Sequence, residues 1–452
     1  MNQEPRIITP DQFTRRSFLQ RGSAALGGAA LIGALAPARF ALGATGGDEI
    51  KLAMVGCGGR GSGAASQALS TSNLGPVKLV AVADVHEDRM QSALKNLQAK
   101  HPDHANVAKE NQFIGFDAYK KAIAMADVVI LSTPPGFRPM MFEEAVRQGK
   151  HIFMEKPVAT DSTGVRKVLA AAKLAKEKGL KVGVGLQRHH QKGYLETMKR
   201  LQDGAIGDIT SMRAYWNGSR PWQKKRADLE KQYGRKLTEM EYQMRNWYYF
   251  TWICGDHICE QHIHNIDVIN WVKNGAPVKA RAIGGREINT GGADDGEIFD
   301  HFAVQYEYED GSISSSECRH QPGCWSSVSE HAVGTKGKVD ISRFVISPKG
   351  GEAWRHDPKG DKEPYQQEHD DFFAAIRNNT PYNEAEYGAM STMTAILGRL
   401  AAYSGKEIEM DKALKSELTI FPKNLAWDAD MPVKPGPDGI YPRAIPGKTT
   451  VI

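Results

Sequence analysis

The chain is poor in cysteine: it has five cysteines among 452 residues, and none of them forms a C-x-x-C pair. Zinc-ribbon and thioredoxin-like proteins are therefore not indicated. Cys318 and Cys324 stand close enough to pair in an oxidising compartment, but we expect both to be free packing residues. Long runs of one charge are also missing, although 58 basic residues slightly outnumber 53 acidic ones. We therefore expect a solvated charged surface and no nucleic-acid partner.

Long hydrophobic runs are missing too. The most apolar stretch, LGGAALIGALA at 26–36, is too short and too rich in glycine to span a bilayer. It follows the twin arginine of TRRSFLQ at 14–20 and precedes small residues that continue to Ala44. This order is typical of a twin-arginine export signal, with a membrane anchor as the alternative. We expect residues 1–44 to be cleaved and the mature protein to be periplasmic or secreted, without membrane association.

The rest of the chain has the composition of an ordinary globular enzyme, with 41% hydrophobic and 25% charged residues. Residues 50–56, IKLAMVG, form a strand pattern that runs into G-x-G-x-x-G at Gly56, Gly58 and Gly61. A helical stretch and the strand VKLVAVAD follow, and that strand ends at Asp84. Strand, glycine turn, helix and strand with a terminal acid are what a dinucleotide site requires, because the backbone must approach the pyrophosphate.

Asp84 also bears on which dinucleotide binds. A carboxylate at this position accepts hydrogen bonds from the ribose hydroxyls and repels a 2′-phosphate. NAD is therefore favoured over NADP, although His86 and Arg89 are close enough in sequence to weaken the preference.

Strands and helices alternate up to about residue 188, which predicts a parallel, doubly wound α/β sheet with its ligand at the carboxyl ends of the strands. Beyond this point strands are joined by turns, as in the hairpin FAVQYEYEDGSISSSEC with its Asp-Gly turn. We predict a Rossmann domain at 48–188 and an α+β domain at 189–452 with a mainly antiparallel sheet and an irregular tail. The residues expected at the cofactor are Gly56, Gly58, Gly59, Arg60, Gly61, Asp84, Thr133, Pro134, Glu155, Lys156 and Gln187.

The stretch GDHICEQHIHNID at 255–267 gathers three histidines and three acids. If it is helical, Glu260 and His264 lie four residues apart on one face, whereas His262 and His264 do not share a face. Zinc needs three or four convergent ligands, so we expect no metal here. A helix start capped by Asp256, with its histidines on the surface, is one alternative, and an acid/base site is the other. Imidazole, which titrates near neutrality, suits the second alternative.

With the glycine loop, S-T-P at 132–134, E-K-P at 155–157 and a histidine-bearing helix before an antiparallel sheet, residues 51–406 resemble the glucose-fructose oxidoreductase and inositol dehydrogenase (Gfo/Idh/MocA) family. The resemblance implies that Lys156 and His264 handle a substrate hydroxyl while hydride passes to nicotinamide. It places Glu260 where the family usually has aspartate. It also implies a homo-oligomer, a dimer or tetramer formed through the open face of the sheet.

Two further departures concern the substrate, for which we single out Arg138, His257, Tyr248 and Trp252. Arg138 replaces the histidine of the family's T-P-x-x-x-H pattern, which would suit an anionic substrate or an internal ion pair. Aromatic residues cluster in an insertion at 219–250 and just after it, where they could stack on a sugar ring or pack in the core.

The expected activity is NAD-dependent oxidation of a secondary hydroxyl of a sugar, cyclitol or glycoside. Free NAD is scarce outside the cytoplasm, so an exported enzyme needs a tightly bound cofactor. The resemblance offers two such cycles: two sugars coupled on one cofactor, or glycoside hydrolysis by transient oxidation, elimination, hydration and re-reduction. A non-catalytic nucleotide- and sugar-binding protein is the remaining alternative.

Overall fold

The computed structural model describes residues 48–288 and 292–452. The chain divides into a unit at 1–40 and a unit at 41–452, and every described residue belongs to the second. The expected export signal at 1–44 lies outside the described residues. Within the described ranges, no helix is both long enough and apolar enough to cross a membrane.

The first sheet is parallel throughout and has six strands in the order β3-β2-β1-β4-β5-β6. This is the doubly wound order of a dinucleotide-binding sheet. Its central strands are continuous apolar runs because helices cover both faces, and every residue of β4 is buried. The predicted Rossmann architecture is therefore confirmed. The strands are β1 (Ile50–Val55), β2 (Val77–Asp84), β3 (Gln112–Ile114), β4 (Val128–Leu131), β5 (His151–Met154) and β6 (Val182–Val184).

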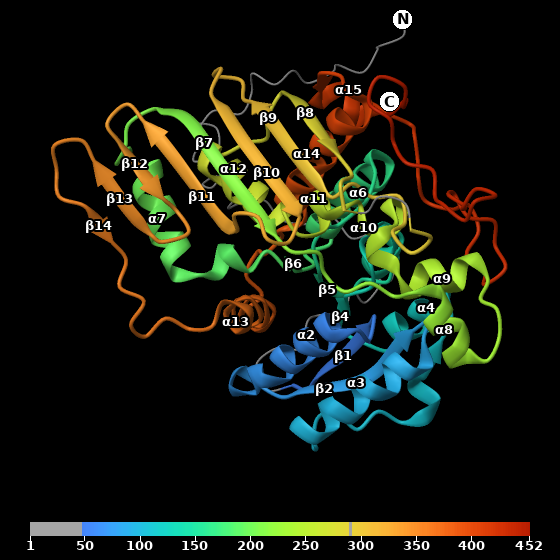
Figure 1. The fold of residues 1–452 in the computed structure, drawn as a ribbon. Helices are drawn as coiled ribbons and strands as arrows, with labels where there is room; N and C mark the ends of the chain where they lie inside the picture. Colours follow the sequence, from blue (N-terminus) through green and yellow to red (C-terminus); the bar gives the residue numbers. More distant parts are fainter. Residues whose placement is uncertain (1–47, 289–291) are drawn as a thin grey trace, which may run out of the picture. The chain divides into compact units, whose positions relative to one another are not determined.

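Of the five helices between these strands, α6 is the one that begins with a side-chain cap. In α6, the side chain of Asp161 accepts a hydrogen bond from the Gly164 amide at 2.7 Å, which caps the first turn. The same helix buries Val165 and Val168 against the sheet. The crossover helices are α2 (Gly59–Leu69), α3 (Glu87–Lys100), α4 (Ala118–Ala124), α5 (Arg138–Arg147) and α6 (Ser162–Glu177) (Figure 1).

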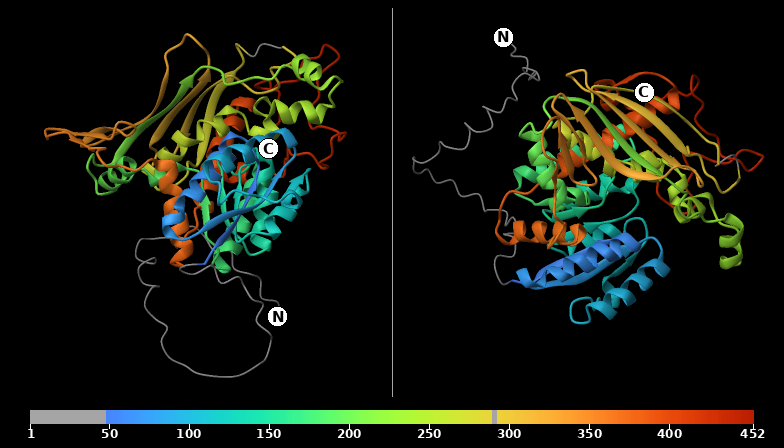
Figure 2. Two further views of the ribbon diagram at one scale, coloured as in Figure 1. Left: turned by 90° about the horizontal axis from the view of Figure 1, so that it is seen from below. Right: turned by 60° about the vertical axis from the view of Figure 1, so that its left-hand side comes forward.

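The second sheet has nine strands in the order β14-β13-β12-β11-β7-β10-β9-β8-β15. All neighbours are antiparallel except β7 and β10, which confirms a mainly antiparallel sheet. Helices α12 (Ile263–Lys273) and α14 (Ala385–Ser404) cover one face (Figure 2). The strands are β7 (Ile209–Gly218), β8 (Lys279–Gly285), β9 (His301–Glu307), β10 (Ile313–His320), β11 (Ser327–Gly334), β12 (Gly337–Asp340), β13 (Val345–Pro348), β14 (Trp354–Arg355) and β15 (Ile408–Glu409).

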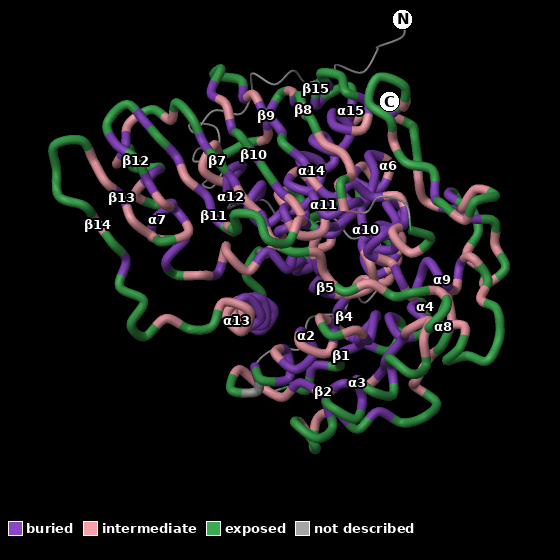
Figure 3. The backbone as a smooth tube through the Cα atoms, viewed as in Figure 1, coloured by how far each residue is buried: buried purple, intermediate pink, exposed green. Residues whose placement is uncertain are grey.

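Burial alternates along the strands of this sheet, as Figure 3 shows by colour. In β9, Phe302, Val304 and Tyr306 are buried, and the residues between them are exposed. The period of two is what a sheet covered on one face requires. The exposed face carries Ile283, whose exposed fraction is 78%.

Later segments return to the nucleotide-binding sheet. Helix α13 (Pro364–Arg377) packs against α2, and Asn383 forms a parallel bridge with Val182 of β6. The insertion forms two short helices, α8 (Arg226–Tyr233) and α9 (Glu239–Arg245). The remaining helices are α7 (Lys192–Gln202), α10 (Thr251–Cys254), α11 (His257–Glu260) and α15 (Met410–Lys415).

Candidate active site

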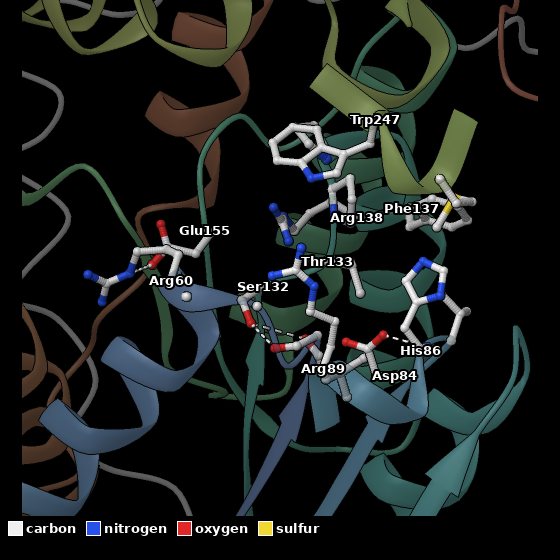
Figure 4. Close-up of a pocket in the computed structure, with 18 of the residues that line it drawn as sticks. Arg60, Asp84, His86, Arg89, Ser132, Thr133, Phe137, Arg138, Glu155 and Trp247 are labelled. Atoms are coloured by element: carbon white, nitrogen blue, oxygen red, sulfur yellow. Dashed lines mark hydrogen bonds and ion pairs between the residues drawn. The ribbon is translucent and has the colours of Figure 1, made fainter. Parts of the chain in front are cut away.

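A cavity of about 700 Å³ lies at the carboxyl ends of β1, β2, β4 and β5, where an open parallel sheet binds its ligands (Figure 4). Its lining combines the glycine turn with residues from α11, α12 and the insertion. Nine of the expected cofactor residues line it: Gly56, Gly58, Gly59, Arg60, Asp84, Thr133, Pro134, Glu155 and Lys156.

The glycine turn is built for close backbone packing. Gly56 has φ +95°, and a Cβ atom there would lie 2.5 Å from the Thr133 amide nitrogen. A Cβ atom on Gly61 would lie 2.1 Å from the Gly56 carbonyl oxygen, so α2 can approach β1 only with glycine at this position. Gly58 has nothing within 4 Å of its added Cβ and faces the cavity. The turn and the first amides of α2 therefore form a cradle that fits a pyrophosphate.

Asp84 ends β2 beside this cradle. Its two carboxylate oxygens accept hydrogen bonds from the amides of Cys57 at 2.6 Å and His86 at 2.8 Å. Burial raises the pKa of Asp84, and these backbone bonds act in the opposite direction by favouring the charged form. The carboxylate is thus fixed where a ribose would lie, and these residues fit NAD.

Glu155 and Lys156 of the E-K-P segment follow β5. The Arg60 Nε atom lies 2.7 Å from a Glu155 carboxylate oxygen, and the Arg60 guanidinium stacks over the Tyr365 ring at 4.9 Å. A Cβ atom on Gly185 would meet the other Glu155 oxygen at 2.4 Å, so the glycine at this position makes room for the carboxylate. Glu155 is therefore held by the glycine turn and by β6, with Lys156 directed toward α11.

Lys156, Glu260 and His264 all line one end of the cavity. The Lys156 ammonium group donates to the Glu260 backbone carbonyl and lies 3.3 Å from its carboxylate Oε1 atom. Burial raises the pKa of Glu260, whereas the charge of Lys156 lowers it. Lys156 and Glu260 of the predicted trio are therefore in direct contact, and His264 lines the same cavity.

The prediction that one helix carries Glu260 and His264 is wrong. Helix α11 ends at Glu260, and α12 begins at Ile263 after Gln261 and His262. His262 turns away from the cavity, and its Nε2 atom lies 2.6 Å from the Ser316 hydroxyl. The hydrogen-bond pattern breaks because buried histidines on this segment pack against the antiparallel sheet. Asp256 does cap α11, as the alternative of a capped helix start expects: at φ +70°, its side chain accepts the His257 amide. The surface histidines of that alternative are wrong, because His257, His262 and His264 are all buried.

His264 is held as a neutral imidazole. Burial is the main cause that lowers its pKa well below the usual value, and the charges of Lys156 and Arg188 add to the effect. Its ring stacks on Trp216 with centroids 5.9 Å apart, and its Nδ1 atom is buried without a hydrogen-bond partner. A neutral imidazole is the form that can accept a proton.

Arg138 also lines the cavity, as Figure 4 shows. It is almost completely buried and donates to the Leu131 carbonyl at 2.8 Å. Burial lowers its pKa to about 10, while Glu155 and Glu260 favour its charged form. A substrate carboxylate would therefore have to compete with these two acids for Arg138.

The other expected residues lie outside the cavity lining. Trp252 is buried and donates to Gln243 at 2.7 Å, and Tyr248 lies 3.4 Å from the His320 ring nitrogen. Both nitrogens of His257 are buried without a partner, and its ring packs against His320. Their predicted substrate roles remain predictions. Gly61 acts through helix packing, and Gln187 lies in a short 3-10 turn after β6.

Several lining residues come from the insertion and were not predicted as cofactor residues: Trp222, Lys224, Met244, Arg245 and Trp247. The signal for them in the sequence is weak: tryptophans interleaved with basic residues. Among the described residues, no group of three or more His, Cys, Asp or Glu side chains is arranged to hold a metal ion.

Comparison with known proteins agrees with this geometry. Residues 50–186 match the model of the oxidoreductase family with an NAD-binding Rossmann fold, GFO_IDH_MocA, and residues 194–340 match the GFO/IDH/MocA C-terminal domain. The chain belongs to the Gfo/Idh/MocA family of oxidoreductases. It is therefore an NAD-binding enzyme, as predicted.

Individual relatives are distant. The 2,7-anhydro-N-acetylneuraminate hydratase of Escherichia coli is 26% identical over 56% of this chain and 62% of its own length. The fold resembles scyllo-inositol dehydrogenase from Lactobacillus casei with bound NAD(H) and scyllo-inositol (TM-score 0.57, 21% identity, 80% of this chain and all of that one). It also resembles aldose-aldose oxidoreductase from Caulobacter crescentus complexed with glycerol (TM-score 0.61, 16% identity, with the same coverage).

Proposed function

We propose that the enzyme oxidises a secondary hydroxyl of a sugar, cyclitol or glycoside with a tightly bound NAD. The observation that carries the proposal is the contact of Lys156 with Glu260 in a cavity that His264 also lines and whose glycine turn and Asp84 fit NAD. The similarity to an inositol dehydrogenase and to an aldose-aldose oxidoreductase supports a polyhydroxylated substrate.

When bound, NAD supplies the acceptor for the hydride that leaves the carbinol carbon. The hydroxyl proton must pass to the protein in the same oxidation. His264, neutral and next to the cationic Lys156, accepts this proton, while the Lys156 ammonium group donates to the substrate oxygen and polarises it. Glu260 holds Lys156 in place through its carbonyl and carboxylate oxygens.

The proposed location is the periplasm or the outside of the cell, reached by the twin-arginine route. A retained cofactor then needs either a second substrate that restores it or a reaction without net redox change. Replacement of Arg15 and Arg16 by lysine should keep the protein in the cytoplasm. Export of that variant at the normal rate, measured by cell fractionation, would remove the localisation.

The second candidate is an enzyme that uses NAD transiently and gives a net hydrolysis or hydration. The similarity to a hydratase favours it, because addition of water involves no net oxidation. This reaction needs a further base and an acid, and the sequence offers Tyr248, Tyr249, His257 and His262 for these roles. None of these four residues lines the cavity, so the site supports this candidate less well than alcohol oxidation. The non-catalytic alternative has no support from this site, because a protein that only binds a sugar does not require the Lys156–Glu260 contact.

The first test is the nucleotide content of protein purified without added cofactor, measured by mass spectrometry after denaturation. We expect NAD in equimolar amount, and its absence would overturn the tightly bound mechanism.

A panel of sugars, cyclitols and glycosides then separates alcohol oxidation from aglycone release. In Lys156→Ala, turnover should fall at least about 100-fold with NAD still bound. A non-catalytic sensor would show no turnover with or without Lys156, and its ligand binding would be unchanged in this variant. Sedimentation tests the proposed dimer or tetramer.

A further inference from the structure

Part of the insertion at 219–250 lines the cavity near the end of β2. Lys224, Met244 and Arg245 line it together with Asp84, which ends β2, and with His86 and Arg89, which follow that strand. The charge of Arg245 acts on Asp84 and contributes, after burial, to lowering the pKa of His86 to about 3. Arg245 is therefore close to the carboxylate that marks the ribose position.

One bidentate ion pair ties the insertion to the nucleotide-binding domain. The Arg245 guanidinium donates to the two carboxylate oxygens of Asp88 at 2.9 Å and 2.7 Å, which joins the end of α9 to the first turn of α3. Arg245 lines the cavity, whereas Asp88 lies outside its lining. Parallel Arg–carboxylate hydrogen bonds fix geometry as well as adding energy, so this contact sets where the insertion sits.

The C-terminal tail, which includes Trp427 and Val433, contacts both the insertion and the cavity lining near the end of β2. The Trp427 ring packs on His86 and Phe116 with centroids 5.7 Å and 4.8 Å away, and both of these residues line the cavity. The Trp427 carbonyl accepts a hydrogen bond from the Thr238 hydroxyl, which caps α9. The Gln243 side chain of α9 also donates to the Val433 carbonyl of the tail at 2.8 Å. The tail thus connects α9 to the wall of the cavity.

We propose that the insertion forms a wall of the NAD site, in addition to the glycine turn and the residues at the end of β2. The Arg245–Asp88 ion pair and Trp427 hold this wall in place, and it slows release of the adenosine half of the cofactor. This inference rests on the proposed tightly bound NAD and identifies the residues that retain it. Lys224 and Arg245 supply the positive charge facing the dinucleotide, and Met244 supplies an apolar contact. The wall comes from a segment outside the β-α-β unit that carries the glycine turn.

The test is the dissociation rate of NADH from the full-length protein, followed by nicotinamide fluorescence after addition of excess NAD. Asp88→Ala breaks the ion pair without changing the cavity lining, and we expect release about fivefold faster. Glu87→Ala is the matched control, because Glu87 is the neighbouring acid in the same first turn of α3, and its ion-pair partner among the described residues is Lys109, at 3.7 Å and away from the insertion. Its release rate should equal that of the wild type.

Two further variants keep the test decisive. Trp427→Ala should also accelerate release, whereas Arg235→Ala, which removes a bidentate pair with Glu241 inside the insertion, should not. Thermal unfolding of each variant shows whether the fold is kept. Equal release rates for folded Asp88→Ala and Glu87→Ala would overturn the wall and leave the oxidoreductase intact. Failure of the wild type to bind NADH would overturn both proposals.

Discussion

The Lys156 ammonium group is held by two oxygens of one residue, the backbone carbonyl and the carboxylate of Glu260. The backbone contact depends on the position of α11 and is independent of the side chain at 260. The carboxylate contact at 3.3 Å adds charge to the site. Position and charge can therefore be separated by mutation.

Glu260→Gln should keep Lys156 in place through the carbonyl and remove only the negative charge. We expect kcat to fall by about tenfold to 100-fold with a smaller change in KM, since the charge acts during proton transfer. Glu260→Asp keeps the charge on a shorter side chain and should retain more activity than the glutamine variant. Steady-state kinetics on the first substrate found would check this order, and equal activity in both variants would contradict a role for the charge.

His264 gives a prediction about pH. Burial and the charges of Lys156 and Arg188 disfavour the imidazolium form, so the ring stays neutral at neutral pH and below. The rate should therefore show no loss caused by His264 protonation near pH 6.5, the usual imidazole pKa. In Lys156→Met the pKa of His264 should rise because a nearby cation is gone. Histidine NMR titration of both proteins measures this, and a fall in the pKa would refute the assignment.

The glycine turn separates packing from binding. In Gly61→Ala the new methyl group would lie 2.1 Å from a backbone oxygen, so we expect a loss of about 2 kcal/mol or more in the free energy of unfolding. Gly58→Ala meets no atom within 4 Å, and its φ of −73° suits alanine. Its stability should change by less than about 1 kcal/mol, whereas NAD affinity falls because the methyl group enters the cradle. Urea unfolding and NADH titration measure the two effects, and the reverse pattern would contradict these assignments.

Local patterns predicted the nucleotide-binding half well. The glycine spacing, Asp84 and E-K-P each depend on a few neighbouring residues and on strand ends, so the sequence was sufficient for them. The break between α11 and α12 was not predicted, because helical spacing alone ignores the packing of His257 and His262 against β10 and its neighbours.

Long-range contacts were beyond such patterns. Arg245 of α9 lies at the cavity because it pairs with Asp88 of α3. These two residues are 157 positions apart in the sequence. His190 is another case: its ring nitrogens lie 2.7 Å from Asp371 and 3.1 Å from Glu384, almost two hundred residues away. These two acids raise its pKa to about 10 against the effect of burial. Nothing near His190 in the sequence indicates such partners.

Asp84 is the residue that we expect to favour NAD over NADP, and its surroundings make this expectation testable. The carboxylate is fixed by two amides and would repel a 2′-phosphate, but Arg89 and Arg245 line the cavity beside it. Asp84→Ser should remove the repulsion and leave both cations, so we expect the NADP-to-NAD affinity ratio to rise by about tenfold to 100-fold. Asp84→Glu, which keeps the charge, is the matched control and should still disfavour NADP. Fluorescence titration with NADH and NADPH measures the ratios. An unchanged affinity ratio in Asp84→Ser would mean that the shape of the cavity excludes the 2′-phosphate. The insertion would then be the first part of the cavity to test. Arg245→Ala would lower NADPH affinity if the charge of Arg245 matters and raise it if the side chain blocks the phosphate.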